Sequence, residues 1–250
     1  MEGEAIIRTM ALTKNYNNHP AVDHLSVRVE AGIIFGFLGP NGAGKTTTLL
    51  MLLGLTQPSG GSARVCGVDP ARRARDVKKL VGYLPENVGF YGDMNAFQSL
   101  QYVADLNGMN GKRTSDRIGE LLEVVGLLEN ASKKVDTYSR GMRQRLGIAE
   151  VLIKEPKVLF LDEPTLGLDP DGALRLIELI QSLNKERGIT VLLSSHHLEQ
   201  VQKISHRVGI MIKGRLVAEN SIDALAKEKF GIGEQKYSLE DVYMKYFRED

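Results

Sequence analysis

Nine consecutive residues match the phosphate-binding loop pattern G-x-x-x-x-G-K-[ST]. They are Gly39, Pro40, Asn41, Gly42, Ala43, Gly44, Lys45, Thr46 and Thr47. Glycines let such a loop bend tightly, so that successive backbone N–H groups point at phosphate oxygens without a side chain in the way. We expect Lys45 to reach the β- and γ-phosphates of a nucleoside triphosphate and the Thr46 hydroxyl to hold Mg²⁺. An accidental glycine-rich turn is the alternative interpretation.

A pair of carboxylates follows an apolar run later in the chain. Asp162 and Glu163 come directly after residues 158–161, which have the pattern of a buried strand. Their carboxylates would emerge at the carboxyl end of that strand, where open α/β sheets bind ligands. We expect Asp162 to hold Mg²⁺ through its water shell, and Glu163 to orient or deprotonate an attacking water molecule. A plain surface pair of acids is the alternative.

Two histidines, His196 and His197, follow the next apolar run at residues 190–193. A histidine at a strand's carboxyl edge can contact the γ-phosphate, and His196 is the stronger candidate of the two. A metal-binding pair is one alternative, but adjacent histidines lack the H-E-x-x-H spacing. An ordinary loop histidine is the other.

The segments around these residues have the patterns of strands and helices that could position them. Residues 33–38 form an apolar run before the phosphate loop, and residues 47–53 have the pattern of a helix after it, so the positive helix end would face the phosphates. The runs at 158–161 and 190–193 are typical of buried parallel strands, with an amphipathic segment at 174–183 between them.

Other segments predict additions to this core. Alternation of apolar and polar residues over 5–38 favours half-buried antiparallel strands, followed after a polar turn at 57–62 by short strands at 63–66 and 81–84. From about 94 to 153 the spacing is helical, which indicates an inserted helical lobe. Residues 207–219 read as a hairpin, and the tail carries two short helices, the second starting at Ser238 with Asp241 as its capping-box partner.

Composition limits the class of protein. The chain of 250 residues carries 32 basic and 31 acidic side chains, so its formal charge of +1 offers no bulk attraction for nucleic acid. Cys66 is the only cysteine, which predicts a reducing compartment and a small core residue. The first four residues include two acids, so we expect no signal peptide, and no apolar run approaches a membrane span.

The order and spacing of these motifs resemble the ATP-binding subunits of ABC transporters over essentially the whole chain. Besides the phosphate loop, the resemblance rests on residues 138–142 (Tyr-Ser-Arg-Gly-Met), 161–164 (Leu-Asp-Glu-Pro), 167–169 (Gly-Leu-Asp) and Ser195-His196. It implies one ABC ATPase domain over 1–250, with the α/β fold of a P-loop NTPase. Residues 1–86 and 156–220 would form a RecA-like core and a flanking antiparallel β-subdomain. An inserted α-helical subdomain would span 87–155 and a C-terminal helical tail 221–250.

The same resemblance implies further ATP-binding residues. Tyr16 would stack on the adenine ring, with Val22 packing nearby; an exposed aromatic at a strand end is the alternative. Ser139 and Gly141 match the signature motif at the start of a helix over 142–153, and Ser139 can also be its N-cap. That helix start would meet the γ-phosphate bound to a second subunit, and Asp169 would act across the same interface. The implied assembly is a homodimer, or a pair with a related ATPase subunit, around two ATP molecules.

Two departures from the family pattern concern this site. Arg140 and Met142 replace the first glycine and the glutamine of the usual Leu-Ser-Gly-Gly-Gln signature; Arg140 either contacts phosphate or, as we favour, faces solvent. Glu86 stands where most members carry a glutamine that senses Mg²⁺ and the attacking water, and a carboxylate there can still ligate Mg²⁺.

In both departures the chain resembles a subgroup of ATPases that pair with ABC-2 type permeases. The leading hypothesis is therefore an ATP-hydrolysing subunit that powers transport by a separate membrane permease, with the chain cytoplasmic and peripheral on the inner face of the membrane. The family docks its permease at the loop from Glu86 through Asn95, where Val88, Phe90, Tyr91 and Met94 either form the docking groove or pack within the lobe. The alternatives are a soluble ABC-type ATPase of translation or DNA maintenance, the ATPase of a copper-enzyme maturation system, and a regulator without turnover. No nucleic-acid partner is expected.

Overall fold

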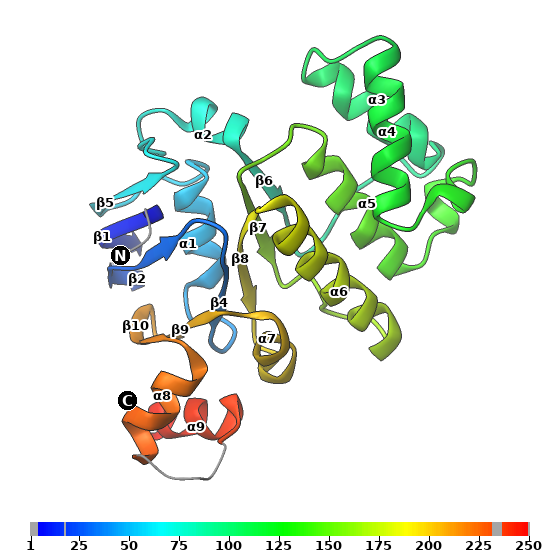
Figure 1. Ribbon diagram of the computed structural model, residues 1–250. Coiled ribbons are helices and arrows are strands. Elements are labelled where there is room, and N and C mark those ends of the chain that lie inside the picture. Colours follow the sequence, from blue (N-terminus) through cyan, green and yellow to red (C-terminus); the bar gives the residue numbers. More distant parts are fainter. Residues whose placement is uncertain (1–4, 18, 232–236, 250) are drawn as a thin grey trace.

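Two β-sheets and a lobe of helices organise the chain (Figure 1). The computed structural model describes residues 5–17, 19–231 and 237–249. The first four residues, on which the expectation about a signal peptide depended, lie outside the described residues. No helix among the described residues is long and apolar enough to cross a membrane.

The central sheet has the strand order β10-β9-β4-β8-β7-β6, and all neighbouring pairs are parallel except β9 with β10. Its strands are β4 (Ile34–Leu38), β6 (Val81–Leu84), β7 (Val158–Asp162), β8 (Thr190–Ser195), β9 (Arg207–Ile212) and β10 (Arg215–Asn220). Every residue of β4, β7 and β8 is buried, as expected for parallel strands that are covered on both faces. The predicted strands at 81–84, 158–161 and 190–193 and the hairpin are confirmed.

A smaller antiparallel sheet covers one side of the core and consists of β1 (Ala5–Tyr16), β2 (His19–Leu25), β3 (Arg28–Glu30) and β5 (Gly60–Val65). The prediction of antiparallel strands holds for these elements, but it is wrong for residues 34–38, because β4 pairs in parallel with β8 and β9. The predicted turn at 57–62 ends earlier than expected, since Gly60 already pairs with Thr13 of β1.

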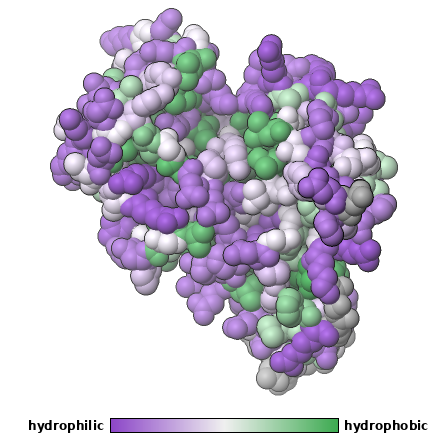
Figure 2. All heavy atoms as spheres, turned by 180° about the vertical axis from the view of Figure 1, so that it is seen from behind, coloured by the Kyte–Doolittle hydropathy of each residue, from purple (hydrophilic) through white to green (hydrophobic). Residues whose placement is uncertain are grey.

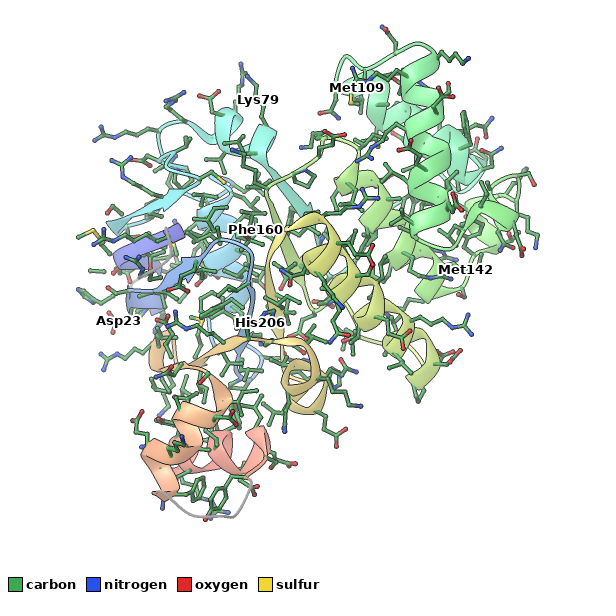
Figure 3. All side chains as sticks on the ribbon, viewed as in Figure 1. Asp23, Lys79, Met109, Met142, Phe160 and His206 are labelled. Atoms are coloured by element: carbon green, nitrogen blue, oxygen red, sulfur yellow. The ribbon has the colours of Figure 1, made fainter. Side chains whose placement is uncertain are left out.

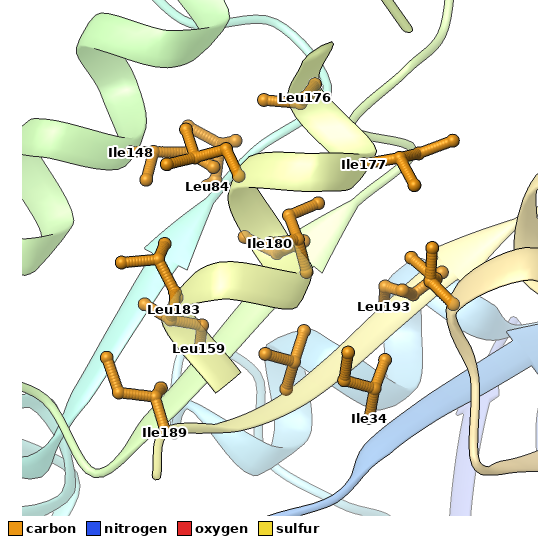
Figure 4. Packing of buried hydrophobic residues seen from close by; sticks show 14 of the residues in the cluster. Ile34, Leu84, Ile148, Leu159, Leu176, Ile177, Ile180, Leu183, Ile189 and Leu193 are labelled. Atoms are coloured by element: carbon orange, nitrogen blue, oxygen red, sulfur yellow. The ribbon is translucent and has the colours of Figure 1, made fainter. Parts of the chain in front are cut away.

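Alternate residues of the central strands belong to two separate hydrophobic clusters. Phe35 and Phe160 face α1 (Lys45–Leu52) and the small sheet, whereas Ile34 and Leu159 face α6 (Pro170–Arg187). Figure 4 shows the second cluster, in which the isoleucines and leucines of α6 lie on the sheet. Because successive side chains of a strand point to opposite faces, the sheet fixes its helices from both sides.

The helical lobe stands beside the sheet and contains α3 (Ala96–Leu106), α4 (Lys112–Val124) and α5 (Arg140–Leu152), with 3₁₀ turns at Leu128–Asn130 and Val135–Thr137 (Figure 1). A capping box between Asn95 and Gln98 starts α3. These elements confirm the helical spacing predicted for residues 94–153. The division of the chain into subdomains at the stated boundaries remains a prediction.

Two short helices were not predicted: α2 (Ala74–Leu80) and α7 (Leu198–Ile204). The tail contains the two predicted helices, α8 (Ile222–Phe230) and α9 (Leu239–Glu249), and Ser238 and Asp241 form the predicted capping box. The interpretation of Cys66 as a core residue is wrong, because the residue is only half-buried at a turn with φ of 49°. Burial still raises the pKa of its thiol.

Candidate functional site

The phosphate loop lies between β4 and α1, as its sequence predicts. Gly44 is the N-cap of α1 with φ of 99°, a conformation that glycine adopts at little cost. A Cβ atom at Gly44 would come within 2.3 Å of the Ala21 carbonyl oxygen. Backbone geometry and close packing therefore both require glycine at this position.

Lys45 is the first residue of α1 and is only 6% exposed. Its ammonium donates hydrogen bonds to the carbonyl oxygens of Gly39 at 2.7 Å and Pro40 at 3.2 Å. It also lies 3.3 Å from Oε1 of Glu163. The lysine is thus folded back onto its own loop, where a triphosphate would compete with these oxygens for the ammonium group.

Asp162 ends β7 and is buried beside the start of α1. Its Oδ1 accepts a hydrogen bond from the Thr46 hydroxyl at 3.1 Å and another from the Ser194 hydroxyl. Ser194 is a site residue that the sequence reasoning missed, although its position opposite Asp162 on the adjacent parallel strand follows from the sheet register. The three side chains bring oxygen atoms from β7, β8 and α1 together.

Glu163 directly follows β7 with φ of 46°, in the left-handed region that is rare for a residue with a side chain. Its N–H donates to the backbone oxygen and the hydroxyl of Ser194, both at 3.1 Å. A glutamate held in a costly backbone conformation by its neighbours is the kind of strain that gathers at functional sites.

The Glu163 carboxylate links Lys45 to His196. Oε2 lies 3.0 Å from His196 Nδ1 and accepts the His196 backbone N–H at 3.3 Å. Oε1 is buried and makes no hydrogen bond, and its contact with Lys45 is an ion pair without hydrogen-bond geometry. His196 therefore fixes one oxygen of the glutamate. The other oxygen becomes available to a water molecule once the Lys45 ammonium moves away from it to bind an anion.

The donor set fits a divalent cation that is shared with phosphate. Thr46 and Asp162 supply neighbouring oxygen atoms, which Mg²⁺ prefers. No group of three or more His, Cys, Asp or Glu side chains that could hold a metal occurs among the described residues. An ion at this site would therefore complete its coordination with phosphate oxygens and water.

Glu86 lies on the loop after β6 and is half-buried. The pKa of the neighbouring Tyr83 is raised to about 12, first by burial and then by the negative charges of Asp162 and Glu86. Glu86 is thus near enough to the site to add negative charge there. Among the described residues, Glu86 does not belong to any group of three or more His, Cys, Asp or Glu side chains that could hold a metal.

Tyr16 and Val22 both belong to the small sheet, and Val22 contacts the phosphate loop. Tyr16 is 47% exposed at the end of β1, and Lys14 Nζ lies 5.0 Å from the centre of its ring. Val22 is fully buried, and its Cγ2 lies 3.2 Å from the Cβ position of Gly44. An exposed aromatic ring at a strand end is suited to stacking on a base.

Ser139, Gly141 and Asp169 line a different cleft of about 360 Å³ between the starts of α5 and α6. Ser139 is the N-cap of α5, as predicted, and accepts the Met142 N–H at 3.2 Å. Asp169 is the N-cap of α6 and accepts the Gly172 N–H at 2.6 Å. Figure 3 shows Met142 on the outer side of the lobe, away from Phe160 in the central sheet.

Arg140 packs its guanidinium against Gly167 in this cleft, since a Cβ at Gly167 would lie 2.6 Å from its terminal nitrogen. The residue is exposed and makes no hydrogen bond or ion pair within the described part of the chain. In the single chain Arg140 thus lies at the open cleft, and its choice between solvent and phosphate stays a prediction. The lining of this cleft contains no residue of the phosphate loop, and no hydrogen bond or ion pair between described residues joins it to Lys45.

Comparisons with known proteins agree with this geometry. The family model described as ABC transporter matches residues 22–166. The chain is 44% identical over 222 residues to the bacitracin transport ATP-binding protein BcrA of Bacillus licheniformis, covering 89% of this chain and 72% of that protein. It is 39% identical to the Nod factor export ATP-binding protein I of Paraburkholderia xenovorans, covering 91% of this chain and 75% of that protein.

The architecture also resembles a solved structure of an ATP-binding subunit of an ABC transporter. The two superpose with a TM-score of 0.84 at 26% identity, covering 97% of this chain and 99% of the other.

Proposed function

Because the chain belongs to the ABC transporter family as an ATP-hydrolysing subunit, we propose that it closes as a dimer on two ATP molecules. In this proposal, closing and reopening power a separate ABC-2 type membrane permease, and the transport is export. The observation that carries the proposal is the linked set Lys45, Glu163 and His196 beside the paired oxygens of Thr46 and Asp162.

Binding begins with the phosphate loop. The backbone N–H groups from Asn41 to Thr47 and the amino end of α1 attract the triphosphate. Lys45 exchanges the carbonyl oxygens of Gly39 and Pro40 for β- and γ-phosphate oxygens, and in doing so leaves Glu163. Tyr16 stacks on the adenine ring while Val22 supports the loop beneath it.

Glu163 then acts on water. Its Oε1, released from Lys45, accepts a hydrogen bond from the water that attacks the γ-phosphate, and the carboxylate orients or deprotonates that water. His196 holds Oε2 and presents its ring to the γ-phosphate. Ser194 bonds to both the backbone N–H of Glu163 and the carboxylate of Asp162. The water held by Glu163 and the ion held near Asp162 therefore keep their relative positions.

Mg²⁺ would be held by the Thr46 hydroxyl and by Asp162 through its water shell, with Glu86 as a further carboxylate ligand. The ion would neutralise charge that develops on the phosphate oxygens. These metal-binding roles rest on the oxygen donors that surround Asp162.

The second half of the site comes from another chain. Ser139 and Gly141 at the amino end of α5 would contact the γ-phosphate bound to a partner chain, and Asp169 would lie at the same interface. The separation of this cleft from Lys45 supports an assembly in which each ATP is held between two chains.

Export and a membrane partner are supported by the relatives, whose names describe bacitracin transport and Nod factor export. The chain would then be cytoplasmic and held at the inner face of the membrane by its permease. The loop from Glu86 through Asn95 is the proposed docking element: Val88 and Phe90 pack against the core, whereas Tyr91 is exposed.

The test is to express the chain with the permease encoded beside its gene and to measure ATP hydrolysis by the purified complex. We expect a stable complex, with hydrolysis about 10²- to 10⁴-fold slower for Glu163→Gln, because that change removes the general base. A wild-type chain that never joins the permease, or a variant that hydrolyses ATP at the wild-type rate, would refute the proposal.

A further inference from the structure

A buried glutamine of the helical lobe reaches the backbone next to Glu163. Gln144 lies one turn after the start of α5, and its side-chain nitrogen Nε2 donates to the carbonyl oxygen of Pro164 at 3.0 Å. Gln144 is only 3% exposed, so water does not compete for this bond. The bond therefore fastens the loop of residues 164–169, which follows Glu163, to the lobe.

Helix α5 is itself held firmly against the core. Seen from behind, a hollow separates the upper parts of the helical lobe and of the core (Figure 2), whereas α5 packs on β6 and α6. A Cβ at Gly147 would lie 2.6 Å from Leu84 Cδ1 and 3.1 Å from Val88 Cγ1, so the packing at this point is close. Gln144 and Gly147 are three residues apart and share one face of the helix. The position of α5 on the core therefore sets the position of the Gln144 amide.

The bond to Pro164 acts on a strained part of the backbone. Glu163 has φ of 46°, a conformation that persists only where the surroundings enforce it. Ser194 holds the Glu163 N–H from β8, and Gln144 holds the carbonyl of the next residue from α5. Because the proline ring fixes φ, the Pro164 carbonyl carbon is rigidly connected to the peptide that joins it to Glu163. Gln144 and Ser194 therefore restrain the glutamate from its two sides.

The other hydrogen bonds of this loop come from the core or from the loop itself. The Thr165 hydroxyl donates to Oε1 of Gln200 on α7, and the Leu166 N–H donates to the Glu163 carbonyl oxygen at 3.0 Å. Within the described part of the chain, the bond from Gln144 is the one hydrogen bond between the helical lobe and residues 163–169. Loss of this amide would leave the other bonds of the loop in place.

Two sites lie within reach of α5 in the proposed dimer. Ser139 and Gly141 at its start would contact the γ-phosphate bound to the partner chain, whereas Gln144, one turn later, contacts the backbone beside the Glu163 of its own chain. A defect in Gln144 would therefore slow hydrolysis at its own chain's site if it acts through Glu163. It would slow hydrolysis at the partner's site if it acts through the start of α5.

We propose that Gln144 is a positioning residue for hydrolysis, whose bond to Pro164 orients the Glu163 carboxylate of the same chain. The inference rests on the proposed function, because it takes Glu163 as the group that acts on water and the dimer as the active form. It adds a residue of the lobe to the hydrolytic site and assigns the chain in which that residue acts. Hydrolysis at a chain's own site then depends on where its α5 lies.

The test begins with ATP hydrolysis by variants of the full chain. Gln144→Met removes the amide at a similar side-chain volume, and Gln144→Asn keeps an amide that is one methylene too short to reach. Gln181→Met is the matched control, because Gln181 also donates through Nε2 to a backbone oxygen, that of Lys203 at 3.1 Å, and neither residue belongs to the loop. A thermal melt and the Kd for ATP establish that each variant folds and binds nucleotide.

We expect both Gln144 variants to lower kcat about tenfold while the Kd for ATP changes less than about twofold, because a misplaced carboxylate slows the reaction without loosening the nucleotide. Gln181→Met should hydrolyse ATP like wild type. This difference between kcat and Kd distinguishes positioning of Glu163 from damage to the binding site.

Mixed dimers identify the chain in which Gln144 acts. Each dimer carries one Glu163→Gln, so that only one Glu163 remains, and one Gln144→Met. With the two substitutions on different chains, the remaining Glu163 shares a chain with Gln144→Met, and kcat should fall about tenfold. With both substitutions on one chain, the remaining Glu163 lies in the unsubstituted chain, and kcat should equal that of a dimer with Glu163→Gln alone.

The inference is overturned if both Gln144 variants hydrolyse ATP at the wild-type rate, or if Gln181→Met loses as much activity as they do. It is also overturned if the mixed dimer with both substitutions on one chain is as slow as the other arrangement or slower, since Gln144 would then act on the partner's site. A wild-type chain that does not hydrolyse ATP, or Glu163→Gln with wild-type activity, refutes the proposed function instead, and the inference fails with it.

Discussion

Replacing Glu150 by glutamine should stabilise the free subunit, and the gain should grow with pH. The variant keeps the shape of the side chain and removes the charge of Glu150, a half-buried residue of α5. In the folded chain, partial burial raises the pKa of Glu150 to about 7, from an ordinary value of 4.5. The folded state therefore binds more protons than the unfolded state between these two values, and the wild-type chain loses stability as pH rises through them.

The size of the effect follows from that difference in pKa. Linkage gives the ionised Glu150 a cost of about 1.4 kcal/mol at pH 5.5 and about 3 kcal/mol at pH 8. Glutamine carries no such pH-dependent cost. The free energy of unfolding of Glu150→Gln, relative to wild type, should therefore increase by about 2 kcal/mol between these two pH values.

Urea unfolding of the nucleotide-free subunit at pH 5.5 and pH 8 measures this difference directly. Glu178→Gln is the control, since Glu178 is exposed on α6, and its effect should not change between the two pH values. A Glu150→Gln effect that is equally independent of pH would refute the reasoning, because it would mean that the Glu150 carboxyl keeps an ordinary pKa through contact with water.

The nucleotide site supports three further predictions. Gly44→Ala should abolish ATP binding in an equilibrium assay and lower stability by about 1–3 kcal/mol, because its Cβ would collide with the Ala21 carbonyl at a φ of 99°; unchanged binding would contradict the loop geometry. Tyr16→Ala should raise the Kd for ATP about fivefold, equivalent to about 1 kcal/mol, whereas Tyr16→Phe keeps the ring and binds normally; equal weakening by both variants would exclude stacking. Ser194→Ala should lower stability by about 1–3 kcal/mol and raise the Mg²⁺ concentration needed for hydrolysis, since Asp162 loses a donor; an unchanged Mg²⁺ dependence would remove Ser194 from the site.

Local patterns predicted the elements that hold the nucleotide site. The strands β6, β7 and β8 could be recognised because each has the apolar composition of a buried strand. The strand, loop and helix around Lys45 could be recognised because the phosphate-loop motif has a fixed backbone shape. The capping box of Ser238 and Asp241 is equally local, since both partners lie within one helical turn. Such features need no knowledge of distant parts of the chain.

Features that depend on distant pairing were not predictable in the same way. The start of β5 depends on Thr13 of β1, and the role of Ser194 depends on the register between β7 and β8. The short helices α2 and α7 each span seven residues, too few for a clear period. Glu150 looks ordinary in the sequence, and only the packing of α5 against the core reduces its contact with water.

The arrangement of ATP between two chains is the central claim, and sedimentation of Glu163→Gln tests it most directly. This variant should bind ATP without hydrolysing it, so the dimer should accumulate with ATP and Mg²⁺ and dissociate when nucleotide is removed. Adding Gly141→Asp should keep the chain folded, because a Cβ there meets nothing closer than 3.9 Å and an acid suits a helix start.

The new carboxylate at position 141 should nevertheless repel the γ-phosphate bound to the partner. The account therefore predicts that Glu163→Gln is a dimer with ATP and that the double variant is a monomer that still binds ATP. A monomeric Glu163→Gln at saturating ATP, or a double variant that dimerises equally well, would contradict it.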